Sequence, residues 1–231
     1  MALKEKNIAN IISLWTEVSA PFNGNYNKES YAYSYLPFSE WPNRLWSYRF
    51  TAFVVDAAIR EMQEGKKKMS ISYWDDDHEL LVSKGFQQKS QLVGMSLPLT
   101  KKLEYEKRLL LMRVENRPQS KQWSDAFQLA FNYFIHEDVI LNSPHSVQYY
   151  TAVLNGEVIG TAILYVHNGI AGIHAVGVLP TKRKMGFADE IMKVLINIAI
   201  ESKASHAVLQ ASKMGIGIYK RLGFQLSLIH I

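Results

Sequence analysis

Apolar and polar positions follow strand-like and helix-like periods in turn along the second half of this chain. Apolar runs and two-residue alternation predict strands at 108–114, 148–154, 158–166, 170–178, 207–210 and 224–231. Apolar positions spaced three and four apart predict helices after residue 117, over 188–199 and over 215–222. Asn155-Gly156, between two predicted strands, is typical of a hairpin turn. This order of elements indicates a mixed α/β domain.

The first half repeats part of this pattern more weakly. It predicts a helix over 53–62, a strand over 69–74, a polar helix start at 75–79 and a closing strand over 93–99. A Gly-Phe pair follows the second of these helices at Gly85-Phe86, as it does at Gly223-Phe224 near the C-terminus. We therefore interpret residues 1 to about 100 as a weaker version of the same unit.

The composition is that of a globular protein. The 231 residues are 48% hydrophobic, which suits one large or two small domains. No apolar run reaches the roughly 18 residues that a membrane span needs, and the N-terminus lacks an uninterrupted signal-peptide core. The absence of cysteine excludes disulfides, cysteine metal sites and a thiol nucleophile. We expect a cytoplasmic protein with no membrane partner.

The net charge of +5 leaves nucleic-acid binding as a possibility, but the basic residues are scattered and form no stripe. Mild positive charge also suits an anionic cofactor. The seven histidines are dispersed, and none shows ligand spacing with acidic residues. We therefore expect neither a nucleic-acid partner nor a metal site.

The segment from Val178 to Ala188 carries the most specific signal. It follows a predicted strand, is basic, contains Gly186 and opens a predicted helix. A turn at a helix N-terminus offers unpaired backbone N–H groups and the positive end of the helix dipole, which together bind pyrophosphate. Gly186 lets the backbone approach a phosphate closely, and Arg183 and Lys184 add positive charge. The alternative is a solvated helix start with no ligand.

A second motif strengthens the ligand interpretation. It runs from Leu209 to Phe224 and contains Tyr219 and the Leu222-Gly223-Phe224 turn. Together the two motifs resemble the GNAT superfamily of acyl-CoA N-acyltransferases, whose Arg/Gln-x-x-Gly-x-Gly/Ala signature is matched by Arg183-x-x-Gly186-x-Ala188. The resemblance covers residues 106–231 and implies a GNAT fold. Residues 1–102 would then be a degenerate GNAT-like half, structural or on the acceptor side.

The resemblance implies acetyl-CoA as co-substrate and a primary amine, on a small molecule or a protein, as acceptor. The implied cofactor contacts come from the strand end, the turn and one later position: Val176, Gly177, Val178, Arg183, Lys184, Met185, Gly186, Phe187, Ala188 and Ser212. The backbone N–H of Val178 would polarise the thioester carbonyl. Gly177 would permit close approach, although packing is an alternative reason for a glycine there.

Three side chains are candidates for catalytic or supporting roles. The resemblance implies Tyr219 as the acid that protonates the leaving thiolate, with packing beneath the cofactor as the alternative. Ser212 stands where the family often has Asn, and we favour a helix N-cap for it over cofactor contact. His174 shares strand parity with Val176 and Val178, so it is a candidate general base, with a satisfied, half-buried histidine as the favoured alternative.

Aromatic residues in the first half alternate in two segments, which predicts strands with one packed face: Tyr31, Tyr33, Tyr35, Trp46 and Tyr48. Core and interface packing is the favoured role for these rings. The alternative is that some of them line an acceptor cleft between the halves. The leading functional hypothesis is an N-acetyltransferase, monomeric or homodimeric. Its rival is a non-catalytic acyl-CoA-binding or sensory protein on the same scaffold.

Overall fold

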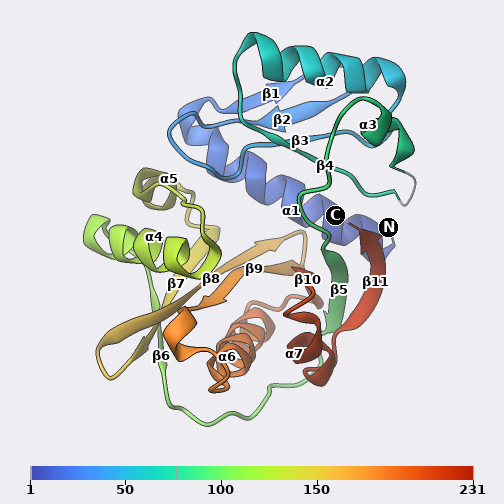
Figure 1. Cartoon of the computed structure of the whole chain (residues 1–231). Helices are drawn as coiled ribbons and strands as arrows, with labels where there is room; N and C mark the ends of the chain where they lie inside the picture. Colours follow the sequence, from blue (N-terminus) through green and yellow to red (C-terminus); the bar gives the residue numbers. More distant parts are fainter. Residues whose placement is uncertain (1, 76–77, 231) are drawn as a thin grey trace.

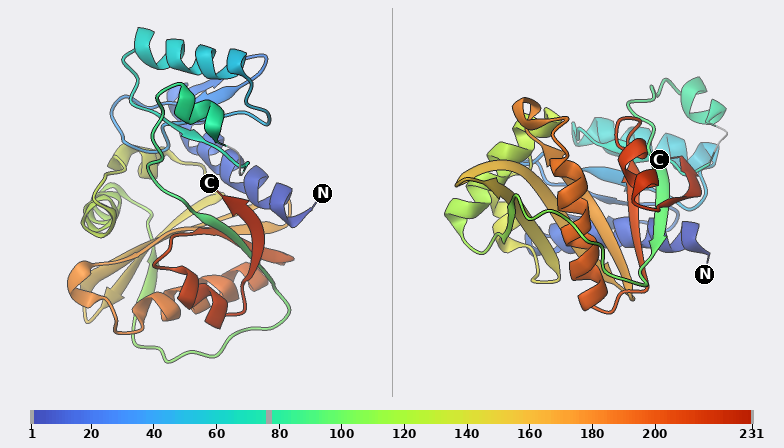
Figure 2. Two further views of the ribbon diagram at one scale, coloured as in Figure 1. Left: turned by 45° about the vertical axis from the view of Figure 1, so that its right-hand side comes forward. Right: turned by 90° about the horizontal axis from the view of Figure 1, so that it is seen from below.

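The computed structural model describes residues 2–75 and 78–230 of the chain. These residues form two β-sheets with a long helix, α1 (Leu3–Ser19), lying between them (Figures 1 and 2). The predicted helix start at 75–79 includes Asp76 and Asp77, which lie outside the described residues. No helix in the described part of the chain is long and apolar enough to span a membrane.

The larger sheet has seven strands in the order β11-β5-β10-β9-β8-β7-β6. In chain order they are β5 (Val93–Pro98), β6 (Leu110–Arg113), β7 (Val147–Leu154), β8 (Glu157–His167), β9 (Ile170–Val178), β10 (His206–Ala211) and β11 (Gln225–His230). Neighbouring strands are antiparallel except β9 and β10, which are parallel. Parallel pairing requires a crossover, and α6 (Phe187–Glu201) provides it. Every strand predicted in the second half is present.

The position of β5 differs from the sequence prediction. We expected a strand at 93–99 to close the first half, but β5 pairs with β10 on one side and with β11 on the other. The first half therefore supplies the second strand from one edge of the larger sheet, so this sheet contains residues from both sides of residue 102. Periodicity identifies a strand but not its partner, because any strand with an apolar face can fill this position.

Helices cover both faces of the larger sheet (Figure 1). On one face, α6 and the short α7 (Ile216–Arg221) enclose a core that includes Ile191 and Leu195. On the other, α1, α4 (Arg117–Phe131) and α5 (Glu137–Asn142) enclose a second core rich in aromatic residues, with Trp123 fully buried. Short 3₁₀ turns follow α1 (Ala20–Phe22) and β9 (Pro180–Lys182).

The smaller sheet belongs to the first half and has the order β1-β2-β3-β4. Its strands are β1 (Asn25–Asn27), β2 (Ala32–Ser34), β3 (Arg44–Trp46) and β4 (Ser70–Ser72). Its parallel pair is β3 with β4, and α2 (Ala52–Glu64) makes the crossover between them. One face packs on α2, with Tyr33 and Leu45 buried, and Trp46 on the other face packs with α1.

The two halves share an order of elements. Three antiparallel strands, a crossover helix, a parallel strand and a short helix follow one another in each, and α3 (Glu79–Ser83) corresponds to α7. The three strands are preceded by α1 in the first half and by β6, α4 and α5 in the second. The short helices end alike, because Phe86 donates to the Leu81 carbonyl and Phe224 to the Tyr219 carbonyl, both at 3.0 Å. The intervening glycines, Gly85 and Gly223, both have positive φ. The two Gly-Phe pairs noted in the sequence thus end two short helices in the same way.

Candidate active site

Strands β9 and β10 are paired over only part of their length. Their register ends at the pair Gly172 and Val208, yet β9 continues to Val178 and β10 to Ala211. β10 is paired with β5 along its whole length, so beyond Val208 β5 is its only strand partner among the described residues. The inner edge of β9 beyond Gly172 thus has backbone groups that no strand pairs, which is an unusual feature for the middle of a sheet.

A bulge in β9 lies beside this divergence. The register with β8 jumps from Thr161–Gly177 to Ile163–His174, and Ala175 has φ of +52°. The Thr161 hydroxyl donates to the Ala175 carbonyl at 3.0 Å. An extra residue in a strand interrupts side-chain alternation. The predicted shared parity of His174 with Val176 and Val178 is therefore wrong: these valines pack in the core under α6, whereas His174 faces α1.

His174 is buried, and a side-chain oxygen lies next to each of its ring nitrogens. Nδ1 lies 3.2 Å from Oε1 of Gln210, and Nε2 lies 3.1 Å from Oδ1 of Asn10. Burial lowers the pKa of His174 to about 4. An imidazole with this pKa is a weak base, and neither nitrogen is directed at open space. The geometry favours the alternative of a satisfied, buried histidine.

The backbone groups of Val178, at the end of β9, point toward the space where β9 and β10 separate. The N–H of Leu179 bonds to the Ile159 carbonyl of β8 at 2.8 Å. Successive residues of an antiparallel strand alternate between their two edges, so the N–H and carbonyl of Val178 point away from β8. Its carbonyl accepts a bond from Nε of Arg183 at 3.1 Å. The Val178 N–H is thus directed to the side where a ligand between β9 and β10 would lie.

Gly177 and Arg183 have packing roles at this strand end. A Cβ on Gly177 would lie 2.4 Å from Cε2 of Phe131 and 3.0 Å from Cβ of Ala130, so α4 packs directly on the backbone there. The packing alternative for Gly177 accounts for this position. Arg183 Nη2 donates to the Ala130 carbonyl at 2.9 Å, and the side chain therefore ties the end of α4 to the end of β9.

The turn before α6 has a run of unused backbone donors. From Lys184 to Asp189, no backbone N–H donates a hydrogen bond to another described residue, and the first helical bond is from Glu190 to Gly186. Lys184 and Gly186 both adopt positive φ, 64° and 83°. Such left-handed residues next to a helix start gather N–H groups into a concave anion site. Phe187 is buried beneath the turn, while Met185 is exposed.

Arg108 and Glu190 support this turn, and the sequence analysis did not predict it. Glu190 is buried, and its carboxylate accepts hydrogen bonds from the backbone N–H groups of Arg108 and Leu109 and from Nε of Arg108, at 2.8, 3.0 and 3.0 Å. Arg108 Nη1 donates to the Met185 carbonyl at 3.1 Å, and its guanidinium stacks over the Phe187 ring. A positive charge thus lies against the turn, 82 residues away in sequence from Glu190.

Tyr219 lies on α7, which follows the diverging end of β10. Its ring is half-buried and packs edge-to-face on Phe224 with centroids 5.9 Å apart. Burial raises the pKa of the phenol to about 12. Its hydroxyl makes no hydrogen bond with the described residues. Ser212 is exposed and does not cap α7 with its side chain, because the helix begins after Gly215; only its carbonyl accepts, from Gly215 and Ile216. The predicted N-cap is therefore wrong.

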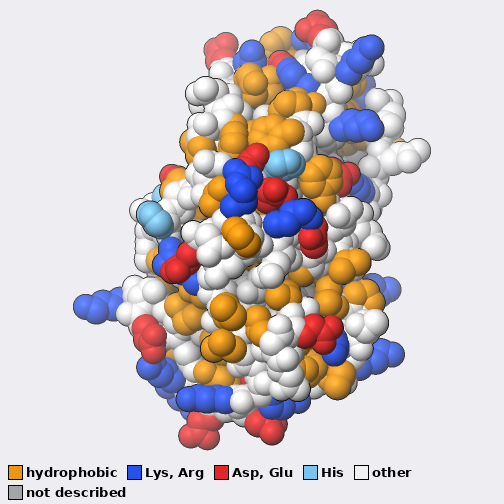
Figure 3. Space-filling model, turned by 90° about the vertical axis from the view of Figure 1, so that its left-hand side faces the viewer, with side chains coloured by type: hydrophobic (Ala, Val, Ile, Leu, Met, Phe, Trp, Pro, Cys, Tyr) orange, Lys and Arg blue, Asp and Glu red, His pale blue; other side chains and the backbone are white. Residues whose placement is uncertain are grey.

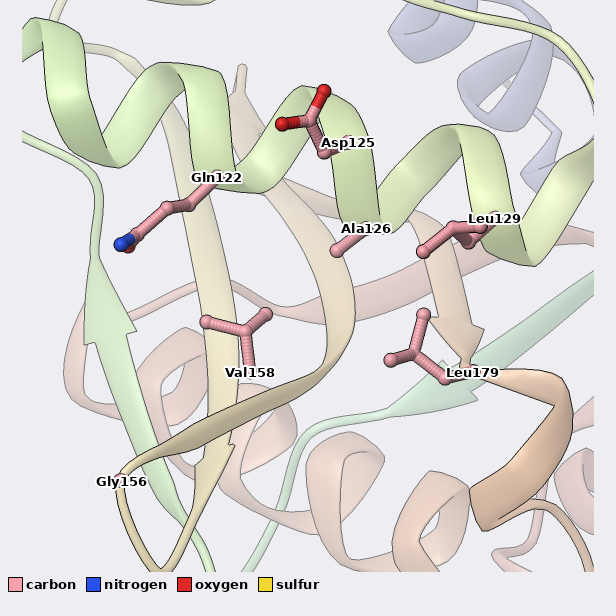
Figure 4. Close-up of a pocket in the computed structure, with 7 residues that line it drawn as sticks. All are labelled: Gln122, Asp125, Ala126, Leu129, Gly156, Val158 and Leu179. Carbon is pink, nitrogen blue, oxygen red and sulfur yellow. The ribbon is translucent and has the colours of Figure 1, made fainter.

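A surface hollow of about 330 Å³ lies beside this region, between α4 and the β7–β8 hairpin (Figure 4). Leu129, Val158 and Leu179 face one another across it, whereas the carboxylate of Asp125 points away. Leu179 connects the hollow to the end of β9. Tyr219 and the turn at 183–188 do not line it, so this hollow is separate from the candidate cofactor path.

The described residues thus combine a parallel strand pair that separates, β9 and β10, with a basic turn of unpaired backbone N–H groups before the crossover helix α6. A sequence model of the Acetyltransferase (GNAT) family matches residues 109–224. The chain belongs to this family. A search of curated protein sequences gives no match.

Solved structures share the fold over the whole chain. A GCN5-related N-acetyltransferase from Kribbella flavida aligns with TM-score 0.76 and 13% identity, covering 100% of this chain and 95% of that one. One from Sphaerobacter thermophilus aligns with TM-score 0.61 and 13% identity, covering 97% and 90%. A conserved protein of unknown function from Staphylococcus epidermidis ATCC 12228 gives 0.62 and 14%, covering 89% and 90%. The GNAT fold expected from the sequence is confirmed.

Proposed function

We propose that this protein is an acetyl-CoA-dependent N-acetyltransferase that transfers an acetyl group directly to a primary amine. The observation that carries the proposal is the run of free N–H groups from Lys184 to Asp189 beside the divergence of β9 and β10. The turn binds the pyrophosphate, and Lys184 and Arg108 add positive charge there. The pantetheine arm, which GNAT enzymes hold along this strand, follows Val176, Gly177 and Val178 between the parting strands.

The acetyl transfer uses the strand end and Tyr219. The Val178 N–H donates to the thioester carbonyl oxygen, which gains negative charge as the amine nitrogen attacks the carbonyl carbon. A C–N bond forms, the C–S bond breaks, and the sulfur leaves as a thiolate. Tyr219 donates its phenolic proton to that thiolate. A pKa of about 12 keeps the phenol protonated at neutral pH, so the acid is in the required form.

The amine must also lose a proton, and we assign that step to solvent. His174 is buried, each of its ring nitrogens lies within 3.2 Å of a side-chain oxygen, and burial lowers its pKa. Asp189 forms an ion pair with Lys193 at 2.9 Å, and Glu190 is buried under Arg108. These contacts leave none of the three with the geometry of a base. Ser212, exposed at the end of β10, is available as a cofactor hydrogen-bond partner.

We infer that residues 1–92 are a degenerate copy of the catalytic half. The shared element order and the paired Gly-Phe helix ends support this inference. Leu81 occupies the position that corresponds to Tyr219, so the first half lacks the phenol acid. Its crossover helix α2 begins with Thr51 as N-cap, and the Thr51 hydroxyl accepts a hydrogen bond from the Val54 N–H. The start of α6 has no such side-chain cap, so its first N–H groups stay free of one.

The same observations give less support to two other functions. A sensory protein that binds acyl-CoA without turnover would not require Tyr219 beside the cofactor path. Nucleic-acid binding would require a continuous basic stripe, whereas on the face that carries α4 and α5 the Lys and Arg side chains are interspersed with acidic and apolar ones (Figure 3).

The test is a thiol-release assay with acetyl-CoA and a panel of primary amines, run on the wild type and on Tyr219→Phe. The proposal expects turnover of at least one amine and a fall in kcat of about 10²–10⁴-fold in the variant. Calorimetric binding of acetyl-CoA without turnover on any amine would favour the sensory function. The absence of both binding and turnover would overturn the proposal.

A further inference from the structure

Two buried asparagines of α1 reach into the larger sheet at the place where β9 and β10 separate. Asn7 and Asn10 are 0% and 1% exposed. Burial of an amide costs free energy unless its polar atoms are bonded. α1 lies N-terminal to the matched family segment, so these side chains belong to the first half.

Asn7 bonds to the carbonyls of two strands that stay together. Its Nδ2 donates to Met95 of β5 at 3.3 Å and to Leu209 of β10 at 3.1 Å. Leu209 is the first residue of β10 beyond its pairing with β9. Asn7 Oδ1 accepts from Nε2 of Gln210, also on β10, at 2.6 Å. Asn7 therefore fixes the diverging end of β10.

Asn10 makes the corresponding bonds on the other side of the divergence. Its Nδ2 donates to the carbonyls of Tyr165 on β8 and Ile170 on β9, at 3.4 and 3.1 Å. Its Oδ1 lies 3.1 Å from Nε2 of His174, and Nδ1 of His174 lies 3.2 Å from Gln210. The chain Asn10–His174–Gln210–Asn7 thus bridges β9 and β10 where backbone pairing stops.

Gly172 is the last residue of β9 that pairs with β10, and the space around it is filled by the bridge. A Cβ there would lie 1.9 Å from Oδ1 of Asn10 and 2.3 Å from Nε2 of His174. The side-chain amides and the imidazole occupy the space that any larger residue would need. Where backbone hydrogen bonds between β9 and β10 are missing, the bridging side chains set the distance between the two strands.

We propose that Asn7 and Asn10 are positioning residues that hold β9 and β10 apart through His174 and Gln210, so that the first half sets the width of the acyl-CoA slot. This inference rests on the proposed function, because the slot is the path assigned there to pantetheine. It gives α1, which lies outside the turn at 183–188, a role in cofactor binding.

The bonding pattern also shows why both asparagines are needed. Each Nδ2 faces two backbone carbonyls, which accept only, so each amide has one orientation and directs Oδ1 at the bridge. Gln210 then directs Nε2 at Asn7 and Oε1 at His174. A neutral imidazole has one N–H and bonds to only one of its two neighbouring oxygens. The two asparagines fix the bridge from its ends.

The test measures the Kd of acetyl-CoA and the steady-state constants of Asn10→Ala and Asn7→Ala in the full chain. Ile11→Ala is the matched control, because Ile11 is buried on the same helix but packs in the apolar cluster and makes none of these bonds. Lys6→Ala controls for truncation of a half-buried side chain elsewhere on α1. Thermal unfolding of every variant gives the loss of stability that each substitution causes.

The proposal expects a rise of about tenfold in Kd and in KM for acetyl-CoA in both asparagine variants, with kcat at saturation within about threefold. Ile11→Ala should lower Tm to a similar extent and leave Kd unchanged. A merely structural role would lower the active fraction, and hence kcat, with Kd unaltered in all variants; that result would overturn the inference. If one asparagine variant fails to fold, the Kd of the other variant tests the proposal. Failure of the wild type to bind would instead count against the proposed function.

Discussion

Replacing Gly186 with alanine separates the cost of the turn's backbone conformation from its role in binding. Gly186 has φ of +83°, a region in which an L-residue costs roughly 1–2 kcal/mol. The new Cβ would also lie 3.2 Å from Nη2 of Arg108, whose guanidinium is held by Glu190 and by the Met185 carbonyl. We therefore expect Gly186→Ala to lower the free energy of unfolding by about 1–2 kcal/mol.

Two other glycines provide matched controls. Gly169 has φ of +71° in the β8–β9 turn, and nothing lies within 4 Å of an added Cβ. Gly169→Ala should cost the same strain without touching the turn at 183–188. Gly217 is inside α7 without positive φ, and its added Cβ would make only an ordinary contact with Arg221, at 3.7 Å. Gly217→Ala should stabilise the protein by up to about 1 kcal/mol.

Urea unfolding and calorimetric titration with CoA measure the two effects side by side. Both Gly186→Ala and Gly169→Ala should be destabilised, but only Gly186→Ala should bind CoA more weakly, by about tenfold, since its Cβ stands in the phosphate cradle. Equal CoA affinity in the two variants would refute the assignment of this turn to pyrophosphate. A stable Gly186→Ala protein would refute the backbone argument.

Three further predictions concern single side chains. Tyr219→Phe should lower kcat with little change in CoA affinity, and the wild type should show no alkaline loss of activity due to this phenol below about pH 11, because its pKa is raised to about 12; a pH–rate profile measures both. Glu190→Gln should cost about 1–3 kcal/mol in urea unfolding and weaken CoA binding, because the buried carboxylate fixes Arg108 against the turn; unchanged stability would contradict this. For His174, the folded pKa of about 4 lies below the unfolded value of about 6.5, so the unfolded chain binds the extra proton. Stability should therefore fall as pH decreases from about 6.5 to 4, by up to about 1.4 kcal/mol per pH unit, and His174→Gln should lose this component; parallel stability curves for the two proteins would contradict the burial argument.

The sequence predicted the elements of the second half because their apolar periods are long and unbroken. β9 and α6 follow the expected ranges closely, and the turn between them lies where the motif places it. The first half was harder. α1 was not predicted, although Ile8, Ile11 and Trp15 have helical spacing and are buried against the larger sheet. That signal was present in the apolar pattern.

Other features of the site could not be read from the sequence. The insertion of β5 between β10 and β11 depends on which sheet edge is free, and a strand pattern does not encode its partner. The bulge at Ala175 breaks the parity on which the placement of His174 depended. Arg108 reaches the turn only because Glu190 pairs with it across the fold. Each of these outcomes is set by tertiary contacts rather than by local periodicity.

Titration of the wild-type chain with acetyl-CoA tests the central claim most directly. The account predicts one site per chain with a Kd in the micromolar range, the order of typical substrate constants, and loss of affinity in Gly186→Ala but not in Gly169→Ala. A folded wild-type protein that binds no acetyl-CoA would contradict the assignment of the turn and the strand divergence as an acyl-CoA site.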